Sequence, residues 1–242
     1  MDIIYPPRCF ICGEFLCDDQ RTDETKGGLF CRACFSGFSR LTSPKCPVCA
    51  VPFITQSGED HLCEACLRKR PHFEAAEAPY LHEGPLMDAI HGFKYGSRRH
   101  IGDSLGPLLA AFAGDWLGES RDILTMPVPL HPRRLRERGF NQSLVLARYV
   151  ARKLDTALDF LSLRRVKYTT PQTGLGRKER RKNVKNAFQL KTPDAVEDRT
   201  ILLVDDVFTT GNTLNECARV LKKGGCEKVL CLVLARAGGA YQ

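Results

Sequence analysis

Apolar and polar positions follow two different patterns along the chain, before and after about residue 80. In the second part, three continuous apolar runs have the length of buried strands: residues 122–130, 200–208 and 228–236. Residues 143–154 and 213–225 instead place apolar side chains every three or four positions, as an amphipathic helix does. Strands that alternate with helices predict an α/β domain over residues 80–242, with a mainly parallel sheet flanked by helices.

The first part contains eight of the chain's 12 cysteines, arranged in four CxxC pairs. The pairs are Cys9/Cys12, Cys31/Cys34, Cys46/Cys49 and Cys63/Cys66. A CxxC turn supplies two thiolates, and zinc takes four such ligands, so residues 1–70 are predicted to form a double zinc-binding module. The 11 residues between the second and third pairs leave room for a helix, FSGFSRL. We therefore favour two consecutive sites over interleaved ones.

The two halves of the module resemble each other, because each has a knuckle followed by a strand that leads into a helix at its second pair. Four thiolates leave no open coordination position, which favours structural over catalytic zinc. His61 and His72 as replacement ligands, and redox CxxC chemistry, are weaker alternatives. The other cysteines lack the spacing and are interpreted as ordinary residues: Cys17, Cys217, Cys226 and Cys231.

Composition excludes several classes of protein. With 43% hydrophobic and 26% charged residues, the chain is neither disordered nor fibrous. No apolar run approaches the roughly 20 residues of a membrane span, and the start, MDIIYPPRCF, lacks the pattern of a signal peptide. We therefore expect a cytoplasmic chain whose reduced cysteines bind metal. Residues 69–79 contain two prolines and little periodicity, and a domain boundary is expected there.

The string DDVFTTGNT, residues 205–213, ends one apolar run and enters a predicted helix. Ligands of parallel sheets bind beyond the carboxyl ends of strands. Gly211 would let backbone amides approach an anion, and the threonine hydroxyls and the helix dipole would help to bind a phosphate. Two adjacent carboxylates would repel a phosphate but accept hydrogen bonds from sugar hydroxyls. The string therefore predicts a ribose 5-phosphate site, and helix capping without a ligand is the weaker alternative.

This string resembles the phosphoribosyl pyrophosphate (PRPP) motif of type I phosphoribosyltransferases, which has four apolar residues, two acids and a TTGxT loop. The resemblance implies that Asp205 and Asp206 bind the ribose hydroxyls and that magnesium bridges ribose and pyrophosphate. It also implies a 5-phosphate loop formed by Thr209, Thr210, Gly211, Asn212 and Thr213. In the general chemistry, a nucleophile attacks the anomeric carbon as pyrophosphate leaves. No catalytic residue is identified.

Positive charge is concentrated in residues 131–191, which contain 17 lysines and arginines and four acids, a charge of +13 against +8 for the whole chain. One cluster follows a predicted strand, where a pyrophosphate loop would lie: Arg133, Arg134, Arg136 and Arg138. A second cluster lies in residues 164–188, a predicted long, mobile loop: Arg177, Lys178, Arg180 and Arg181.

Two interpretations of this charge stay open: a cationic loop that closes over PRPP, and a groove for a nucleic-acid backbone. Phe140, Tyr168 and Phe188 lie among these cations and are candidates either for stacking on bases or for the core.

The CxxC pairs, the strings PVPLHPRRLRERGFNQS and PQTGLGRKERRKNV, and the PRPP motif together resemble the ComF family of competence proteins, of the ComFC type, over nearly the whole chain. The resemblance implies a type I phosphoribosyltransferase-like domain that handles single-stranded DNA during natural transformation, beside a DNA-translocating ATPase. Ala50 departs from the pattern, because glycine is usual after such a pair. Lys94 and Arg98 are interpreted as a basic connection leading into a helix rather than as phosphate ligands.

Two further functions are weighed against this one. An active phosphoribosyltransferase would transfer phosphoribosyl from PRPP to an unidentified acceptor and release pyrophosphate. A third possibility is that the zinc module is chiefly a docking surface for a partner protein.

Overall fold

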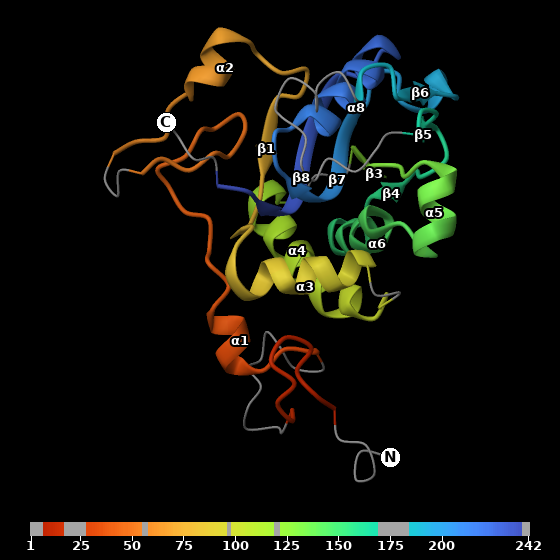
Figure 1. Ribbon diagram of the computed structural model, residues 1–242. Helices are drawn as coiled ribbons and strands as arrows, with labels where there is room; N and C mark the ends of the chain where they lie inside the picture. Colours follow the sequence, from red (N-terminus) through yellow and green to blue (C-terminus); the bar gives the residue numbers. More distant parts are fainter. Residues whose placement is uncertain are drawn as a thin grey trace.

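A parallel sheet forms the centre of the computed structural model, which describes residues 7–16, 28–54, 58–95, 98–118, 122–168 and 184–238 (Figure 1). In this part of the chain the sheet has six strands in the order β1-β8-β7-β3-β4, and β2 pairs with β8. The strands are β1 (Ala75–Glu77), β2 (Tyr80–Leu81), β3 (Ile123–Pro127), β4 (Ala157–Leu158), β7 (Thr200–Phe208) and β8 (Lys228–Arg236). All their pairings are parallel, which confirms the predicted fold class.

The two longest strands coincide with predicted runs, since β7 covers residues 200–208 and β8 covers residues 228–236. Strand β3 is shorter than the predicted 122–130. Pro127 and Pro129 have no N–H to donate, so the regular strand ends at Pro127. Side chains of β7 alternate between two cores, with Ile201 in one and Leu202 in the other.

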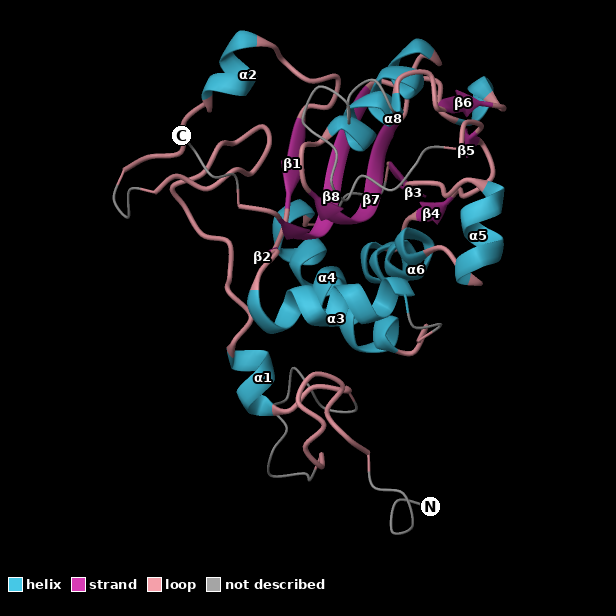
Figure 2. Ribbon diagram, viewed as in Figure 1, coloured by secondary structure: helices cyan, strands magenta, loops and turns pink. Residues whose placement is uncertain are grey.

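Helices cover both faces of the sheet (Figure 2). One face packs against α3 (Gly84–Tyr95), α4 (Ile101–Leu117) and α6 (Gln142–Leu154), and the other against α8 (Asn212–Lys223). Helices α6 and α8 confirm the helical periodicity of residues 143–154 and 213–225. The remaining elements of the domain are α5 (Pro132–Arg138), β5 (Leu163–Arg165), β6 (Phe188–Leu190) and the 3₁₀ helix η3 (Pro193–Ala195). None of the described helices has both the length and the hydropathy to cross a membrane.

The expectation of a continuous loop over residues 164–188 is wrong at both ends. Arg164 and Arg165 belong to β5, which pairs antiparallel with β6 beginning at Phe188. Strands of three residues are too short to give a readable period in the sequence, and they are stabilised by their pairing and by the burial of Leu163 and Phe188 in the core.

The cysteine-rich part forms two ribbons. The first ribbon comprises residues 7–16 and 28–38, and the second comprises residues 44–54 and 58–68. Each has a short helix directly after the first cysteine of its second pair, α1 (Arg32–Ser36) and α2 (Glu64–Arg68), as the internal repeat predicts. The predicted FSGFSRL helix is wrong, because α1 ends at Ser36. Gly37 follows it, and a side chain there would lie only 3.0 Å from Pro85 of α3.

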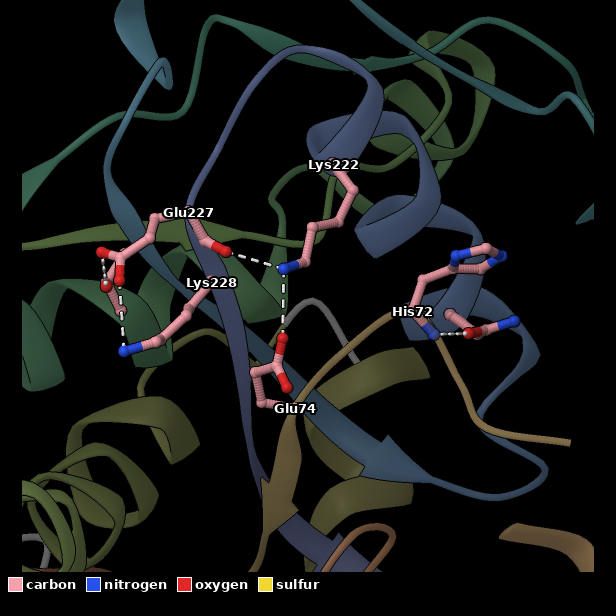
Figure 3. A network of polar contacts seen from close by, with 7 residues as sticks. His72, Glu74, Lys222, Glu227 and Lys228 are labelled. Carbon is pink, nitrogen blue, oxygen red and sulfur yellow. Dashed lines mark hydrogen bonds and ion pairs between the residues drawn. The ribbon is translucent and has the colours of Figure 1, made fainter. Parts of the chain in front are cut away.

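The segment between the ribbons and the domain, residues 69–79, packs against the sheet and contains β1. Ala76 at its centre donates a backbone hydrogen bond to Val48 O of the second ribbon, at 2.9 Å. Figure 3 shows how polar contacts hold the segment beside α8 and β8. The Lys222 ammonium donates to Glu74 Oε1 at 3.0 Å and to Glu227 O at 2.7 Å. The strand is held by these contacts and not by a periodic apolar face. Its sequence therefore gives no sign of it.

Candidate functional site

The eight paired cysteines form two separate clusters, in which the sulfur atoms lie within 4.8 Å of one another. One cluster contains Cys9, Cys12, Cys31 and Cys34, and the other contains Cys46, Cys49, Cys63 and Cys66. This confirms consecutive sites. Tetrahedral zinc with sulfur ligands at about 2.3 Å requires sulfurs about 3.8 Å apart. The observed Cys12–Cys31 and Cys49–Cys63 separations are 3.7 and 3.6 Å, so both clusters fit zinc, which would crosslink each ribbon.

Neither histidine considered as a replacement ligand belongs to a cluster. His61 stacks on Phe53 with ring centroids 3.8 Å apart, and His72 is exposed. The unpaired cysteines of the described domain, Cys217, Cys226 and Cys231, are buried as ordinary core residues. Cys17 lies outside the described residues.

Asp205 and Asp206 lie near the carboxyl end of β7, and other elements hold both carboxylates. Ser143 at the start of α6 donates its hydroxyl to Asp205 Oδ1 at 2.8 Å, and Lys94 forms an ion pair with Asp206 Oδ2. Burial and the neighbouring Asp206 charge raise the pKa of Asp205 to about 7. Burial also opposes ionisation of Asp206, but Lys94 and, more weakly, Arg138 hold the pKa of that carboxyl below its ordinary value. The site therefore combines one ionised carboxylate with one that can exchange a proton near neutral pH.

Lys94 is the residue of the site that the sequence interpretation missed. It lies in the last turn of α3, four positions after the buried Ile90. A lysine on the apolar stripe of a helix was the available signal, because such a position faces the interior and requires an anionic partner. Arg98, considered together with it, instead places its guanidinium 5.1 Å from the Phe10 ring of the first ribbon.

The loop from Thr209 to Thr213 connects β7 to α8 and lines a hollow together with Asp205. Gly211 has φ of +72°, and a Cβ there would lie 2.4 Å from the Phe208 ring, so both conformation and space require glycine. Its backbone precedes the first turn of α8, where amides without helical partners point outward. The side-chain nitrogen of Asn212 is buried without a hydrogen-bond partner. Unused donors of this kind suit an anion.

The first arginine cluster lies on a helix, which corrects the expectation of a loop after β3. His131 caps helix α5 by accepting from the Arg133 N–H at 3.2 Å, and Gly139 ends it. Of the four arginines, Arg138 is near enough for its charge to interact with both Asp206 and Asp205, and its guanidinium lies 5.2 Å from the Tyr95 ring. Arg133 pairs with Glu137 at 3.0 Å. Arg134 is half-buried, and Arg136 is exposed.

The aromatic candidates for base stacking are already in contact with protein groups. Phe140 packs on Phe93 at 5.4 Å, and Phe188 belongs to the core beside α8. The Arg133 guanidinium lies 4.6 Å from the Tyr168 ring. The second basic cluster, Arg177, Lys178, Arg180 and Arg181, lies outside the described residues.

Comparison with known proteins agrees with this architecture. Residues 1–67 match the family model of the double zinc ribbon domain, and residues 141–242 match that of the phosphoribosyl transferase domain. The DNA utilization protein YhgH of Escherichia coli K12 is 34% identical over 210 residues, which cover 85% of this chain and 89% of that protein. Competence protein F of Haemophilus influenzae is 36% identical over 179 residues, covering 72% and 78%. The chain belongs to the ComF family.

A more distant ComF relative extends the match to almost the full length. Competence protein ComFC of Bacillus subtilis is 26% identical over 244 residues, which cover 92% of this chain and 94% of that protein. The match to ComFC therefore spans both the cysteine-rich part and the phosphoribosyl transferase domain of this chain.

This ComF chain also has a groove of about 700 Å³ between α5, α6 and the β5–β6 pair. Apolar side chains that are partly exposed line it: Leu135, Phe160, Leu161 and Val166. Exposed cations also line it: Arg99, Arg148, Arg164 and Lys191. Among the described residues that line the groove, none is acidic. It is therefore both apolar and cationic.

Proposed function

We propose that this ComF-family chain binds PRPP at Asp205, Asp206 and the loop Thr209–Thr213, and that it handles single-stranded DNA during natural transformation. The observation that carries the proposal is the partnered, buried acid pair directly before a loop with unused donors. Such a pair can accept hydrogen bonds from two adjacent ribose hydroxyls, and the loop can donate to a 5-phosphate.

Each group has a role in this proposal. The loop amides and threonine hydroxyls would bind the 5-phosphate, and the Asn212 amide would gain a partner. Arg138, beside the acid pair, would face the pyrophosphate, with the other α5 arginines further from it. Because Lys94 already pairs with Asp206, we expect magnesium to bind mainly to oxygens of PRPP, where it would offset the pyrophosphate charge. Lys94 would keep Asp206 ionised as the hydroxyls bind.

Isothermal titration with PRPP and magnesium tests the site. Asp206→Asn should weaken binding about tenfold or more, as expected when hydrogen bonds to a charged acceptor are lost. Asp103→Asn is the matched control, because that carboxylate instead accepts a hydrogen bond from Tyr149 at 2.8 Å. Equal affinities for the unaltered chain and Asp206→Asn would exclude the acid pair as the ribose site.

The DNA part of the proposal is supported by the names of the relatives, a DNA utilization protein and competence proteins. The apolar, cationic groove supports it as well, because single strands bind to surfaces that combine positive charge with apolar contact for bases. A DNA-translocating ATPase would act on the same strand. We also propose a cytoplasmic location, since the cysteines of both clusters must stay reduced to bind zinc.

Fluorescence anisotropy with a labelled oligo(dT) tests the groove. Binding by the unaltered chain should weaken steeply with salt, and the logarithmic slope should fall by about 0.7 for each phosphate contact removed from a single strand. Arg148→Ala/Arg164→Ala should reduce both affinity and slope. Arg152→Ala is the control, because it lies one turn from Arg148 on α6 but not in the groove. Unchanged affinity in the double variant would place the strand elsewhere.

An active phosphoribosyltransferase is the second candidate function, favoured by the raised pKa of Asp205, about 7. A carboxyl that titrates near neutral pH can act as a general base. It can take a proton from the phosphoribosyl acceptor while that acceptor attacks the anomeric carbon. Pyrophosphate release from PRPP and magnesium, measured with nucleobases, amines and oligonucleotides as acceptors, tests this function. Pyrophosphate release that requires an acceptor and is lost in Asp205→Asn supports transferase activity. The absence of pyrophosphate release with every acceptor tested opposes it.

A further inference from the structure

Arg236, the last residue of β8, connects the second cysteine cluster to the phosphate loop. Its side chain is buried, with 6% of the residue exposed. Nε donates to Cys49 O at 2.9 Å, and Nη1 donates to Thr209 O at 2.9 Å and to Phe208 O at 3.1 Å. One guanidinium therefore binds the backbone of a cysteine in the zinc cluster and the backbone at the start of the loop.

The planarity of the guanidinium makes this connection rigid. An arginine presents its N–H donors in a fixed fork, so a shift of one acceptor must either turn the fork or lengthen the other hydrogen bonds. The centroid of the Phe208 ring lies 4.4 Å from the guanidinium, and this ring packs edge-on against Phe73, which limits such turning. The same ring borders Gly211 in the loop.

The Cys49 carbonyl belongs to the knuckle whose two thiols, from Cys46 and Cys49, would bind zinc. Without the metal, this turn is held by backbone hydrogen bonds, such as Ala50 N–H to Cys46 O at 2.8 Å and Ala76 N–H to Val48 O at 2.9 Å, and by the burial of Val48 and Ala50 in the core. Zinc would add two sulfur–metal bonds to these contacts, which would restrict the Cys49 carbonyl further and, through Arg236, order the loop.

We propose that Arg236 couples zinc binding at the second cluster to anion binding at the loop Thr209–Thr213. Zinc in the second site orders the loop, and a bound anion in turn retains that zinc, because coupling between two sites is reciprocal. For PRPP as the anion, the inference rests on the proposed function. The first cluster serves as an internal comparison, since its ribbon contacts α3 and α4 through Phe10 and Leu29.

Hydrogen exchange of the amides of residues 209–213, measured in the full chain with zinc bound, tests the connection without any ligand. In Arg236→Lys, these loop amides should exchange at least about fivefold faster than in the unaltered chain. A factor of about five is the lower end of the range typical for the coupling between two sites. The matched control is Lys45→Met. Lys45 joins the same ribbon to β1 by an ion pair with Glu77, at 2.6 Å, and its substitution should leave loop exchange unchanged.

Zinc release to a chromophoric chelator tests the reciprocal effect on the unaltered chain. Saturating PRPP with magnesium should slow one of the two release phases about fivefold or more. Cys12→Ser, which removes a ligand of the first site, should keep the PRPP-sensitive phase. Arg236→Lys should lose the sensitivity to PRPP while it keeps two bound zinc ions, which a purely structural role of Arg236 would not produce.

The coupling would be overturned if the loop amides of folded, zinc-loaded Arg236→Lys exchanged as slowly as those of the unaltered chain. It would also be overturned if PRPP slowed both phases of zinc release equally. If PRPP does not bind the unaltered chain, the proposed function fails, and hydrogen exchange alone decides the coupling. If Arg236→Lys does not fold, loop exchange is compared in Cys12→Ser chains before and after chelation of their remaining zinc. Chelation that speeds exchange more in residues 209–213 than in the core amides of β7 supports the coupling, and equal acceleration or unchanged exchange overturns it.

Discussion

The two zinc ribbons share one local design but pack on opposite faces of the sheet. The first ribbon inserts Phe30, Phe35 and Phe38 into the core formed with α3, α4 and α6. All four cysteines of the second ribbon are buried in the other core, with α8 and alternate residues of β7 and β8. In the first ribbon, Cys12 is exposed and Cys34 only half-buried. The same repeated motif is therefore buried to different degrees in the two ribbons, because different elements surround it.

Each ribbon also lies next to a different half of the candidate site. The first contacts α3, where a Cβ on Gly92 would lie 2.2 Å from Phe10, and the same helix provides Lys94 to Asp206. The second ribbon contacts the phosphate loop through Arg236. The first cysteine cluster therefore lies in a small apolar cluster outside the two main cores, although its ribbon packs on α3, whereas the second cysteine cluster lies within a main core.

Removing one zinc site at a time is the strongest test of this difference. Cys66→Ser should destabilise the whole domain, because structural zinc contributes about 10–16 kcal/mol in isolated fingers and domains have only about 5–15 kcal/mol in total. Cys12→Ser should leave the unfolding of the sheet cooperative. Urea unfolding, followed by circular dichroism, compares the free energy of unfolding of the two variants, and mass spectrometry measures the zinc content of each. Equal losses of stability would abolish the distinction between the ribbons.

Loss of the ion pair on the first ribbon's side should have an intermediate effect. Lys94→Met leaves Asp206 buried beside Asp205 without its cation, and should cost about 2–3 kcal/mol, below the roughly 3–5 kcal/mol of a fully buried pair. Lys94→Met/Asp206→Asn should recover most of that loss. Denaturant unfolding near pH 7 measures both. A single variant as stable as the unaltered chain would show that Asp206 is well solvated.

The knuckle turns provide the smallest test. Gly13 and Ala50 occupy equivalent positions and both have positive φ, +77° and +51°. Gly13→Ala in the first ribbon meets no atom within 4 Å, so it should cost only the backbone strain, about 1–2 kcal/mol. Ala50→Gly relieves similar strain but loses a buried methyl group, worth about 0.8 kcal/mol, so its net effect should lie within about 1 kcal/mol of zero. Thermal unfolding compares them, and a larger loss for Ala50→Gly would contradict this account.

The amino-acid sequence predicts features that depend on neighbours along the chain. Apolar runs of strand length predict β7 and β8, CxxC spacing predicts both cysteine clusters, and residues 205–213 predict the acid pair and its loop. In each case the signal is local, because a strand period, a metal knuckle or a strand-to-helix turn is complete within about ten residues. The short strands β1, β5 and β6 give no such signal, since pairing and polar contacts with distant segments stabilise them.

The tertiary structure alone decides which distant residues complete the site. The place of Lys94 on an apolar helix stripe indicates that it needs an anionic partner, but the sequence does not identify that partner as Asp206. Nothing near Arg236 indicates that it joins Cys49 to Thr209. Those meetings depend on how α3 crosses the sheet and on which face each ribbon covers. Buried charges and backbone carbonyls need partners, and only the packed fold determines which groups are near enough to provide them.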